Sequence, residues 1–222
     1  MASSRLAGLS ECALLRRRMV ERLAAGGISD PRVLKAFFEV PRHRLVSEAL
    51  RGRAYRDVAL PIGEGQTISA PGVVAAMTQA LDLAGHETVL DVGTGSGYQA
   101  AILSRLAARV VSIERVGRLA AAARLALDHL GVSNVVVYLG DGSLGRPADA
   151  PYDAIVVAAG GPEVPRPLLE QLRPGGRLVG PFGGRKEQRL VRVERGENGA
   201  FHREVIGRCR FVDLVGAHGW AA

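Results

Sequence analysis

Cysteine is scarce in this sequence, which contains only Cys12 and Cys209. The two thiols lie near opposite ends of the chain and form no C-x-x-C motif. This spacing excludes a thiol redox motif and a cysteine-rich metal site. Cysteine usage of this kind is typical of a reducing compartment, so we expect a cytoplasmic protein.

Long apolar runs and metal-ligand motifs are also missing. The first residues, MASSRLAGLSECALLRRR, contain no apolar core of signal-peptide length, and no stretch of the chain is long enough to span a bilayer. The five histidines never fall at metal-ligand spacing, and there is no H-E-x-x-H motif. We therefore expect a soluble protein without a membrane partner or a metal site.

Lysine is nearly absent, because Lys35 and Lys186 are the only lysines among 29 basic residues. With 22 acidic residues the formal net charge is +7, so a polyanionic partner has to be considered. The arginines are scattered, however, and Arg16, Arg17 and Arg18 form the only compact run. This distribution is typical of solvated or ion-paired arginines and argues against a nucleic-acid partner.

Aromatic residues make up 5% of the chain, against 47% hydrophobic residues and 28 glycines. Together with many short Val/Ile/Leu runs, this composition is typical of an α/β protein. A length of 222 residues suits one domain with terminal additions. We expect a monomeric single domain with an amino-terminal helical subdomain at 1–59, a cofactor-binding core at 60–183 and carboxy-terminal edge strands with a substrate-side segment at 184–222.

Hydrophobic periodicity predicts helices that alternate with short strands. The helices are expected at 14–25, from Pro31 to a stop at Val40-Pro41, and at 72–83, 98–107, 116–130 and 166–172, and the strands at 88–92, 109–113, 135–139, 152–157 and 177–181. Pro174-Gly175-Gly176 should end the last helix. This order indicates a doubly wound, mostly parallel, Rossmann-like sheet. Residues 189–195 and 201–210 alternate apolar with charged residues and predict an antiparallel hairpin at the sheet edge.

The fold should be organised around Thr88 to Ala101, TVLDVGTGSGYQAA, in which a buried strand passes through a G-x-G-x-G turn into a helix. Gly93, Gly95 and Gly97 remove the Cβ atoms that would block a tight turn and the approach of a ligand. The N–H groups that open the helix point towards such a ligand. The segment therefore predicts a nucleotide-cofactor site.

Acidic residues after neighbouring strands narrow the choice of cofactor. Glu114 ends the second strand, where a carboxylate accepts hydrogen bonds from both ribose hydroxyls. Asp141, followed by Gly142, ends the third strand and would accept from the exocyclic amine of adenine, and Asp91 suits a positive amino-acid end. Tyr98 stands where a dinucleotide fingerprint has its third glycine, which disfavours a pyrophosphate. The combination favours S-adenosylmethionine over a dinucleotide.

Two segments before the glycine turn allow two interpretations each. The stretch from Leu60 to Pro71, LPIGEGQTISAP, has no helical or strand period, and its composition fits either a binding loop or a plain connection. Asp57, in AYRDVAL, could meet the substrate backbone or form a hydrogen bond that fixes its own loop.

With these residues placed, the sequence resembles the protein-L-isoaspartate O-methyltransferase family. The block LPIGEGQTIS is diagnostic, since a generic methyltransferase would share the glycine turn but not this loop. The matching blocks run nearly end to end: VPRHRLV (40–46), AYRDVALPIGEGQTIS (54–69), VLDVGTGSGYQAA (89–101), SIER (112–115), LGDGSLG (139–145), APYDAIVVAA (150–159), LRPGGRLVGPFG (172–183) and FVDLVGAHGW (211–220).

The resemblance implies methylation, by S-adenosylmethionine, of the α-carboxylate of L-isoaspartyl residues in damaged proteins, which starts repair through a succinimide. It also implies that the GQTIS loop covers the cofactor and that Ser69, the catalytic residue, lies at the acceptor carboxylate. The implied cofactor residues are Gln66, Thr67, Ile68, Asp91, Gly93, Thr94, Gly95, Ser96, Gly97, Glu114, Arg115, Asp141 and Gly142, and the implied substrate residues are Thr67, Ser69, Asp57 and Leu214.

Methyl transfer to a carboxylate needs no strong base, because the acceptor is already ionised at neutral pH. This explains why the sequence shows no catalytic dyad. The alternative is a related class I methyltransferase that acts on another acceptor, either the carboxylate of a dedicated peptide or RNA. The chain departs from the family at Gly72, where a tyrosine or histidine is more usual, and at Asp213, which replaces a proline. The family also has an altered order of its last two strands, which the sequence leaves open.

Overall fold

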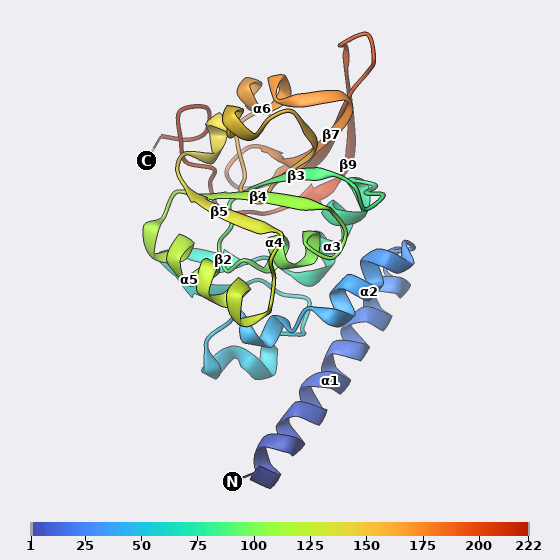
Figure 1. The fold of residues 1–222 in the computed structure, drawn as a ribbon, viewed down its shortest axis with the longest axis vertical. Coiled ribbons are helices and arrows are strands. Elements are labelled where there is room, and N and C mark those ends of the chain that lie inside the picture. The colour runs from blue at the N-terminus through green and yellow to red at the C-terminus, as the bar shows by residue number, and fades with distance from the viewer. Residues whose placement is uncertain (1, 222) are drawn as a thin grey trace.

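The computed structural model describes the backbone of residues 2–221 and the side chains of residues 12–221. Its centre is a seven-stranded sheet. In spatial order the strands are β5 (Val135–Leu139), β4 (Arg109–Glu114), β3 (Thr88–Val92), β6 (Tyr152–Val157), β7 (Leu172–Gly183), β8 (Gln188–Arg195) and β9 (Phe201–Cys209). One face is covered by α3 (Pro71–Ala80), α4 (Tyr98–Leu103) and α5 (Gly117–His129), and the other carries α6 (Arg166–Glu170) (Figure 1).

The sheet has a parallel part and an antiparallel edge. Strands β5, β4, β3, β6 and β7 run parallel, whereas β8 is antiparallel to β7 and β9 to β8. Strands β3 and β6 are almost completely buried, as expected where layers cover both faces of a parallel sheet. These features confirm the predicted fold class, including the edge hairpin. The order of the last strands, open from sequence, places β8 beside β7 and β9 at the edge.

Helices precede the sheet, as predicted: α1 (Ala2–Ala25), α2 (Pro31–Glu39) and the 3-10 turns η1 (Arg42–Arg44) and η2 (Glu48–Arg53). Helix α1 begins earlier than the predicted residue 14, and its amino-terminal part extends away from the body (Figure 1). Helix α2 begins after Asp30, whose carboxylate accepts a hydrogen bond from Arg32 N at 2.8 Å. Met19 and Phe37 join the same hydrophobic cluster as Ile102 of α4, so the helical segment packs directly on the core.

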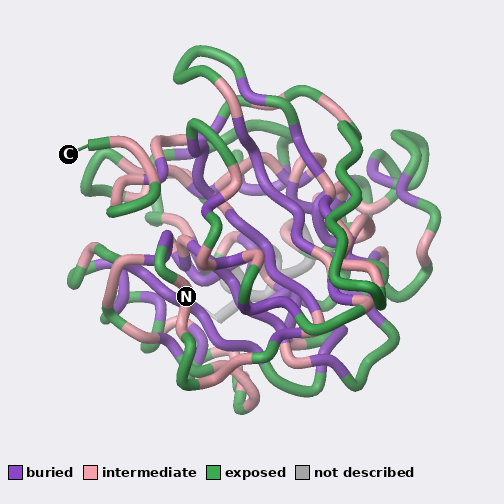
Figure 2. The backbone as a smooth tube through the Cα atoms, turned by 90° about the horizontal axis from the view of Figure 1, so that it is seen from above, coloured by how far each residue is buried: buried purple, intermediate pink, exposed green. Residues whose placement is uncertain are grey.

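Buried segments follow the strands through the centre of the molecule, with exposed loops around them (Figure 2). One hydrophobic cluster joins the sheet to α2, α3 and α4, and a second lies on the face of α6, where it includes Leu168 and Leu214. Among the described helices, none combines the length and the hydropathy needed to cross a membrane.

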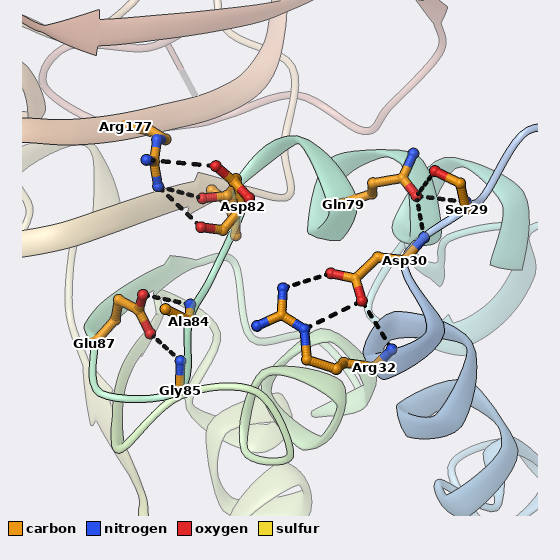
Figure 3. A network of polar contacts seen from close by, with 10 residues as sticks. Ser29, Asp30, Arg32, Gln79, Asp82, Ala84, Gly85, Glu87 and Arg177 are labelled. Carbon is orange, nitrogen blue, oxygen red and sulfur yellow. Dashed lines mark hydrogen bonds and ion pairs between the residues drawn. The ribbon is translucent and has the colours of Figure 1, made fainter.

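Polar contacts tie the amino-terminal segments to α3 and the sheet (Figure 3). The Gln79 side-chain oxygen accepts hydrogen bonds from Ser29 N at 2.7 Å and Asp30 N at 3.0 Å. At the carboxyl end of α3, Arg177 of β7 donates to the carbonyl oxygens of Leu81 and Asp82 at 3.1 and 3.0 Å. A guanidinium at this end of a helix supplies donors to carbonyls that lack intrahelical partners. Both sets of contacts hold the carboxyl end of α3.

Two stretches differ from the sequence-based predictions. The segment expected to be a loop without strand period contains a small antiparallel hairpin of β1 (Leu60–Gly63) and β2 (Gln66–Ile68). Its turn residues Glu64 and Gly65 both have positive φ, 52° and 68°, which matches the right-handed twist of a two-residue hairpin. Strands of four and three residues are too short to show a period. The expected stop at Pro174-Gly175-Gly176 is also wrong, because β7 runs through it with a shift in register against β6.

Replacing Gln79 tests this attachment of the amino-terminal helices. Gln79→Ala removes the acceptor that two backbone N–H groups share, so we expect the free energy of unfolding to fall by about 1 kcal/mol in urea titrations. Gln79→Glu keeps the acceptor oxygens and should retain most of the stability. Equal losses in both variants would contradict the role given to the side-chain oxygen.

Candidate active site

The candidate site lies where the carboxyl ends of β3, β4 and β6 meet, with β3 between the other two. In an open parallel sheet this is the place where the chain connections diverge and ligands bind. Two adjoining hollows open there, with about 590 and 390 Å³ of space when the open solvent at their mouths is included. Both are lined by Thr67, Gly93, Gly95 and Ala158, so these four residues form the boundary between them.

The first hollow, named here the Glu114 hollow, brings together distant parts of the chain. Its lining residues are Gln66, Thr67, Val92, Gly93, Gly95, Ile113, Glu114, Arg115, Val116, Gly142, Ala158, Ala159, Val212, Asp213, Leu214 and Val215. The second, the Ser69 hollow, is lined by Thr67, Ile68, Ser69, Val74, Met77, Gly93, Thr94, Gly95, Ser96, Tyr98, Gln99, Ala158 and Phe211. The hairpin of β1 and β2 therefore contributes to both hollows.

The glycines of the turn serve different purposes. Gly93 and Gly95 have φ of 93° and 53° and line both hollows, where absent side chains leave the backbone accessible to a ligand. Gly97 also has positive φ, 82°, but it lines neither hollow; a Cβ there would meet Leu127 of α5 at 3.5 Å. The positive φ, rather than lack of space, therefore favours glycine at position 97, the N-cap of α4.

Glu114 connects the end of β4 to the turn. Its Oε2 accepts a hydrogen bond from Gly95 N and its Oε1 from Val116 N, both at 2.9 Å. Each carboxylate oxygen has two lone pairs, so one on each oxygen remains for a ligand hydroxyl. The side chain is buried and lines the Glu114 hollow, whereas the neighbouring Arg115 is exposed at its rim.

Asp91 lies beneath the turn and lines neither hollow. It is fully buried, and its Oδ2 accepts a hydrogen bond from Ser112 Oγ at 2.7 Å. The Ser112 hydroxyl lies 2.6 Å from that of Thr94, which lines the Ser69 hollow. Among the described residues, Asp91 Oδ1 has no partner. Burial raises the pKa of Asp91 to about 7, an effect that the Ser112 hydrogen bond opposes and the charge of Glu114 reinforces.

Asp141 and Gly142, which follow β5, occupy different positions relative to the Glu114 hollow. Gly142 lines it, and a Cβ there would lie 2.6 Å from Val92 Cγ1, so only glycine fits without displacement. Asp141 lines the surface next to it and accepts hydrogen bonds from Ser143 N at 2.9 Å and Ala217 N at 2.7 Å. Burial raises the pKa of this carboxyl, but the hydrogen bonds outweigh burial and hold the pKa below its usual range.

The expected substrate residues are separated in the structure. Ser69 lines one hollow and Leu214 the other, but Asp57 lines neither. Asp57 Oδ1 accepts a hydrogen bond from Gly72 N at 2.7 Å in the first turn of α3, whose N-cap residue Ala70 provides no side-chain acceptor. A Cβ at Gly72 would lie 2.8 Å from Asp57 Oδ2. This contact is of the loop-fixing kind, and it accounts for glycine at position 72.

Sequence reasoning missed two groups of lining residues. Ala158 and Ala159 directly follow β6, and the rule that ligands bind at the carboxyl ends of adjacent strands could have identified them. The second group consists of Val212, Asp213 and Val215, which flank the predicted Leu214. They reach the site because Gly160 N donates to Val212 O at 2.7 Å and Leu214 N to Gly160 O at 2.8 Å. No local pattern in the sequence predicts this contact.

The strand order, the glycine turn and the acidic residues define a Rossmann-like methyltransferase that uses S-adenosylmethionine. A model of the family described as protein-L-isoaspartate(D-aspartate) O-methyltransferase matches residues 15–219. The chain belongs to this family.

Relatives and solved structures agree with that assignment. The chain is 54% identical over 209 residues to protein-L-isoaspartate O-methyltransferase 2 of Geotalea uraniireducens, covering 94% of this chain and 96% of the relative. It is 56% identical over 206 residues to protein-L-isoaspartate O-methyltransferase 1 of Syntrophobacter fumaroxidans, covering 92% and 96%. A solved protein-L-isoaspartate O-methyltransferase superposes with a TM-score of 0.84 at 30% identity, covering 92% of this chain and 67% of the other.

A solved Plasmodium falciparum structure, in complex with S-adenosyl-L-homocysteine, has a TM-score of 0.78 at 24% identity. The match covers 90% of this chain and 98% of the Plasmodium falciparum protein, and this likeness supports the fold.

The raised pKa of Asp91 predicts a pH-dependent stability. Because the folded state holds this proton up to about pH 7 and the unfolded state releases it near pH 4, stability should fall as pH rises between these values. Asp91→Asn keeps an acceptor for Ser112 and removes the buried charge. In urea titrations without cofactor, we expect the variant to gain up to about 4 kcal/mol over the parent at pH 8 and little at pH 4.

Asp128→Asn, an exposed substitution on α5, is the matched control and should show no such trend. A difference between Asp91→Asn and the parent that is constant from pH 4 to pH 8 would contradict the titration of Asp91.

Proposed function

We propose that this protein transfers the methyl group of S-adenosylmethionine to the α-carboxylate of L-isoaspartyl residues in damaged proteins. The backbone amide nitrogen then attacks the methyl ester and displaces methanol to form a succinimide, and hydrolysis returns part of the succinimide to aspartate. The observation that carries the proposal is the hairpin of β1 and β2, which bears the diagnostic GQTIS segment. Its Thr67 lines both hollows and its Ser69 lines the second, so one short segment faces the cofactor side and the acceptor side together.

The residues of the Glu114 hollow fit the cofactor. Glu114 keeps a free lone pair on each carboxylate oxygen for the ribose hydroxyls, and Gly142 lines the same hollow, where its backbone would face the adenine. Asp141 lies next to Gly142, where its carboxylate can accept from the adenine amine. Asp91 cannot meet the cofactor directly; it would act on the amino-acid end through the hydroxyls of Ser112 and Thr94. The cofactor supplies an electrophilic methyl group on a sulfonium.

The protein's part in the reaction is to orient and enclose the acceptor. An isoaspartyl α-carboxylate is ionised at neutral pH and is itself the nucleophile. Ser69 would donate a hydrogen bond that aims one carboxylate oxygen at the methyl group, while Thr67 and Ile68 keep water away. Orientation of this kind can supply about 7 to 11 kcal/mol of the barrier. No step needs a general base.

The distribution of charge gives less support to other methyl acceptors, such as RNA, than to the isoaspartyl carboxylate. Many arginines that make the chain basic are paired with acids, as Arg109 is with Asp149 and Arg192 with Glu194 and Glu204. We propose that the protein acts as a monomer in the cytoplasm, where Cys12 and Cys209, both free in the structure, would stay reduced.

A labelling experiment tests the reaction. The protein is incubated with labelled S-adenosylmethionine and paired peptides that differ only in isoaspartate or aspartate, with RNA as a further acceptor. We expect base-labile label on the isoaspartyl peptide alone, because the product is a carboxyl methyl ester. Label on RNA, or on neither peptide, would rule out the proposed substrate.

Ser69→Ala tests the orienting role. We expect kcat for the isoaspartyl peptide to fall about 100-fold, since loss of the hydrogen bond lets the carboxylate rotate out of line. Cofactor affinity, measured by calorimetry, should stay nearly unchanged. Ser133→Ala, in an exposed loop before β5, is the matched control and should turn over like the parent. Unchanged turnover of Ser69→Ala would remove Ser69 from the site.

A further inference from the structure

Arg185 lies in the turn between β7 and β8. Because β7 is parallel to β6 and β3, this turn is at the same end of the strands as the glycine turn. The end of β7 is fixed there because Gly183 N donates to Gly161 O at 2.9 Å, just beyond β6. From this turn, Arg185 Nε reaches Asp213 Oδ2 at 3.1 Å. Asp213 lines the Glu114 hollow, so the guanidinium lies at the rim of the active site.

Two contacts fix the guanidinium of Arg185. Asp213 holds Nε, and the indole of Trp220 lies beneath the guanidinium, with Arg185 Cζ 4.8 Å from the ring centroid. Trp220 is itself anchored, because its Nε1 donates to Gly160 O at 2.9 Å and its backbone N to Leu214 O at 2.7 Å. An arginine side chain that is still 55% exposed is thereby held in one orientation.

The remaining donors of Arg185 are suited to a carboxylate. Within the described part of the chain, the ion pair with Asp213 uses Nε, and no hydrogen bond or ion pair engages Nη1 or Nη2. These two nitrogens form a planar fork that matches the two oxygens of a carboxylate. Because Asp213 already pairs with the guanidinium at Nε, a second carboxylate would approach Nη1 and Nη2 from the solvent.

We propose that Arg185 forms a subsite for a carboxylate that the substrate peptide carries outside its isoaspartyl residue. The proposal rests on the peptide methylation proposed above and adds a preference among damaged sites. The carboxylate can come from a neighbouring aspartate or glutamate or from the peptide's own carboxyl terminus. Asp213 and Trp220 act as positioning residues for Arg185, and the acceptor carboxylate is held elsewhere, at Ser69.

The test compares peptides that contain one isoaspartate and an amidated terminus, with glutamate or glutamine placed singly at each of the two positions on either side. A further peptide has glutamine at all these positions and a free terminal carboxylate. It tests whether the peptide's own carboxyl terminus can supply the carboxylate. For the parent enzyme, we expect kcat/KM at one position to be about three to five times higher with glutamate than with glutamine, mainly through KM. The ratio should approach one in 0.5 M salt, because an exposed ion pair is screened.

In Arg185→Gln the glutamate-to-glutamine ratio should fall to about one. Arg185→Lys keeps the charge without the fork and should give an intermediate ratio. Lys186→Gln removes a charge from the same turn, where Lys186 is exposed, and should keep the parental ratio.

The proposal would be overturned if the parent enzyme gave the same kcat/KM with glutamate and with glutamine at every position. It would also be overturned if the parental preference for glutamate survived in Arg185→Gln. An equal loss of kcat on both peptides in Arg185→Gln would overturn it too, because that result would place Arg185 at the acceptor carboxylate. If the parent methylates no isoaspartyl peptide at all, the proposed function itself is wrong.

Discussion

The close approach of backbones at the carboxyl end of β3 is the constraint on which the rest of the structure depends. Gly142 lies so near Val92 that a Cβ would be 2.6 Å from the valine side chain. On the other side, Gly93 passes Ala158 after β6 with room for ordinary contact, and its positive φ of 93° is what favours glycine. Protein interiors tolerate little change in volume at such contacts. Gly93, Gly142 and Ala158 all line the Glu114 hollow, so small residues at these strand ends leave room for it.

Charges around this end of the sheet are held by backbone groups and hydroxyls. Glu114 accepts from two N–H groups that belong to the glycine turn and to the segment opening α5, so one carboxylate fixes the relative position of both. Asp91 is buried more deeply and has weaker support, a single hydroxyl, which is why its pKa rises to about 7. The two acids thus differ in role: Glu114 presents lone pairs to the hollow, whereas Asp91 acts through Ser112 and Thr94.

Features encoded by a few adjacent residues could be predicted from the sequence, whereas features that depend on distant contacts could not. The strand, the glycine turn and Glu114 are encoded within a few residues each, so the parallel sheet and the Glu114 hollow were predictable. The hairpin at Leu60–Ile68 was not, since its strands are too short for a period and a non-glycine residue, Glu64, adopts positive φ. The contribution of Asp213 depends on a bridge to Gly160, more than fifty residues earlier in the chain, and no local pattern encodes it.

The two departures from the family pattern are each compensated by a contact that the sequence could not reveal. At Gly72, the missing side chain leaves room for the Asp57 carboxylate, which takes over the capping of α3 that Ala70 cannot provide. A carboxylate near a helix N-terminus is also favoured by the helix dipole. At position 213, an aspartate at the rim of an anion-accepting site would repel the substrate if it stood alone. Its pairing with Arg185 removes that repulsion and turns the guanidinium towards solvent in a fixed orientation. In both places the substituted residue can be understood only together with the charged residue that contacts it.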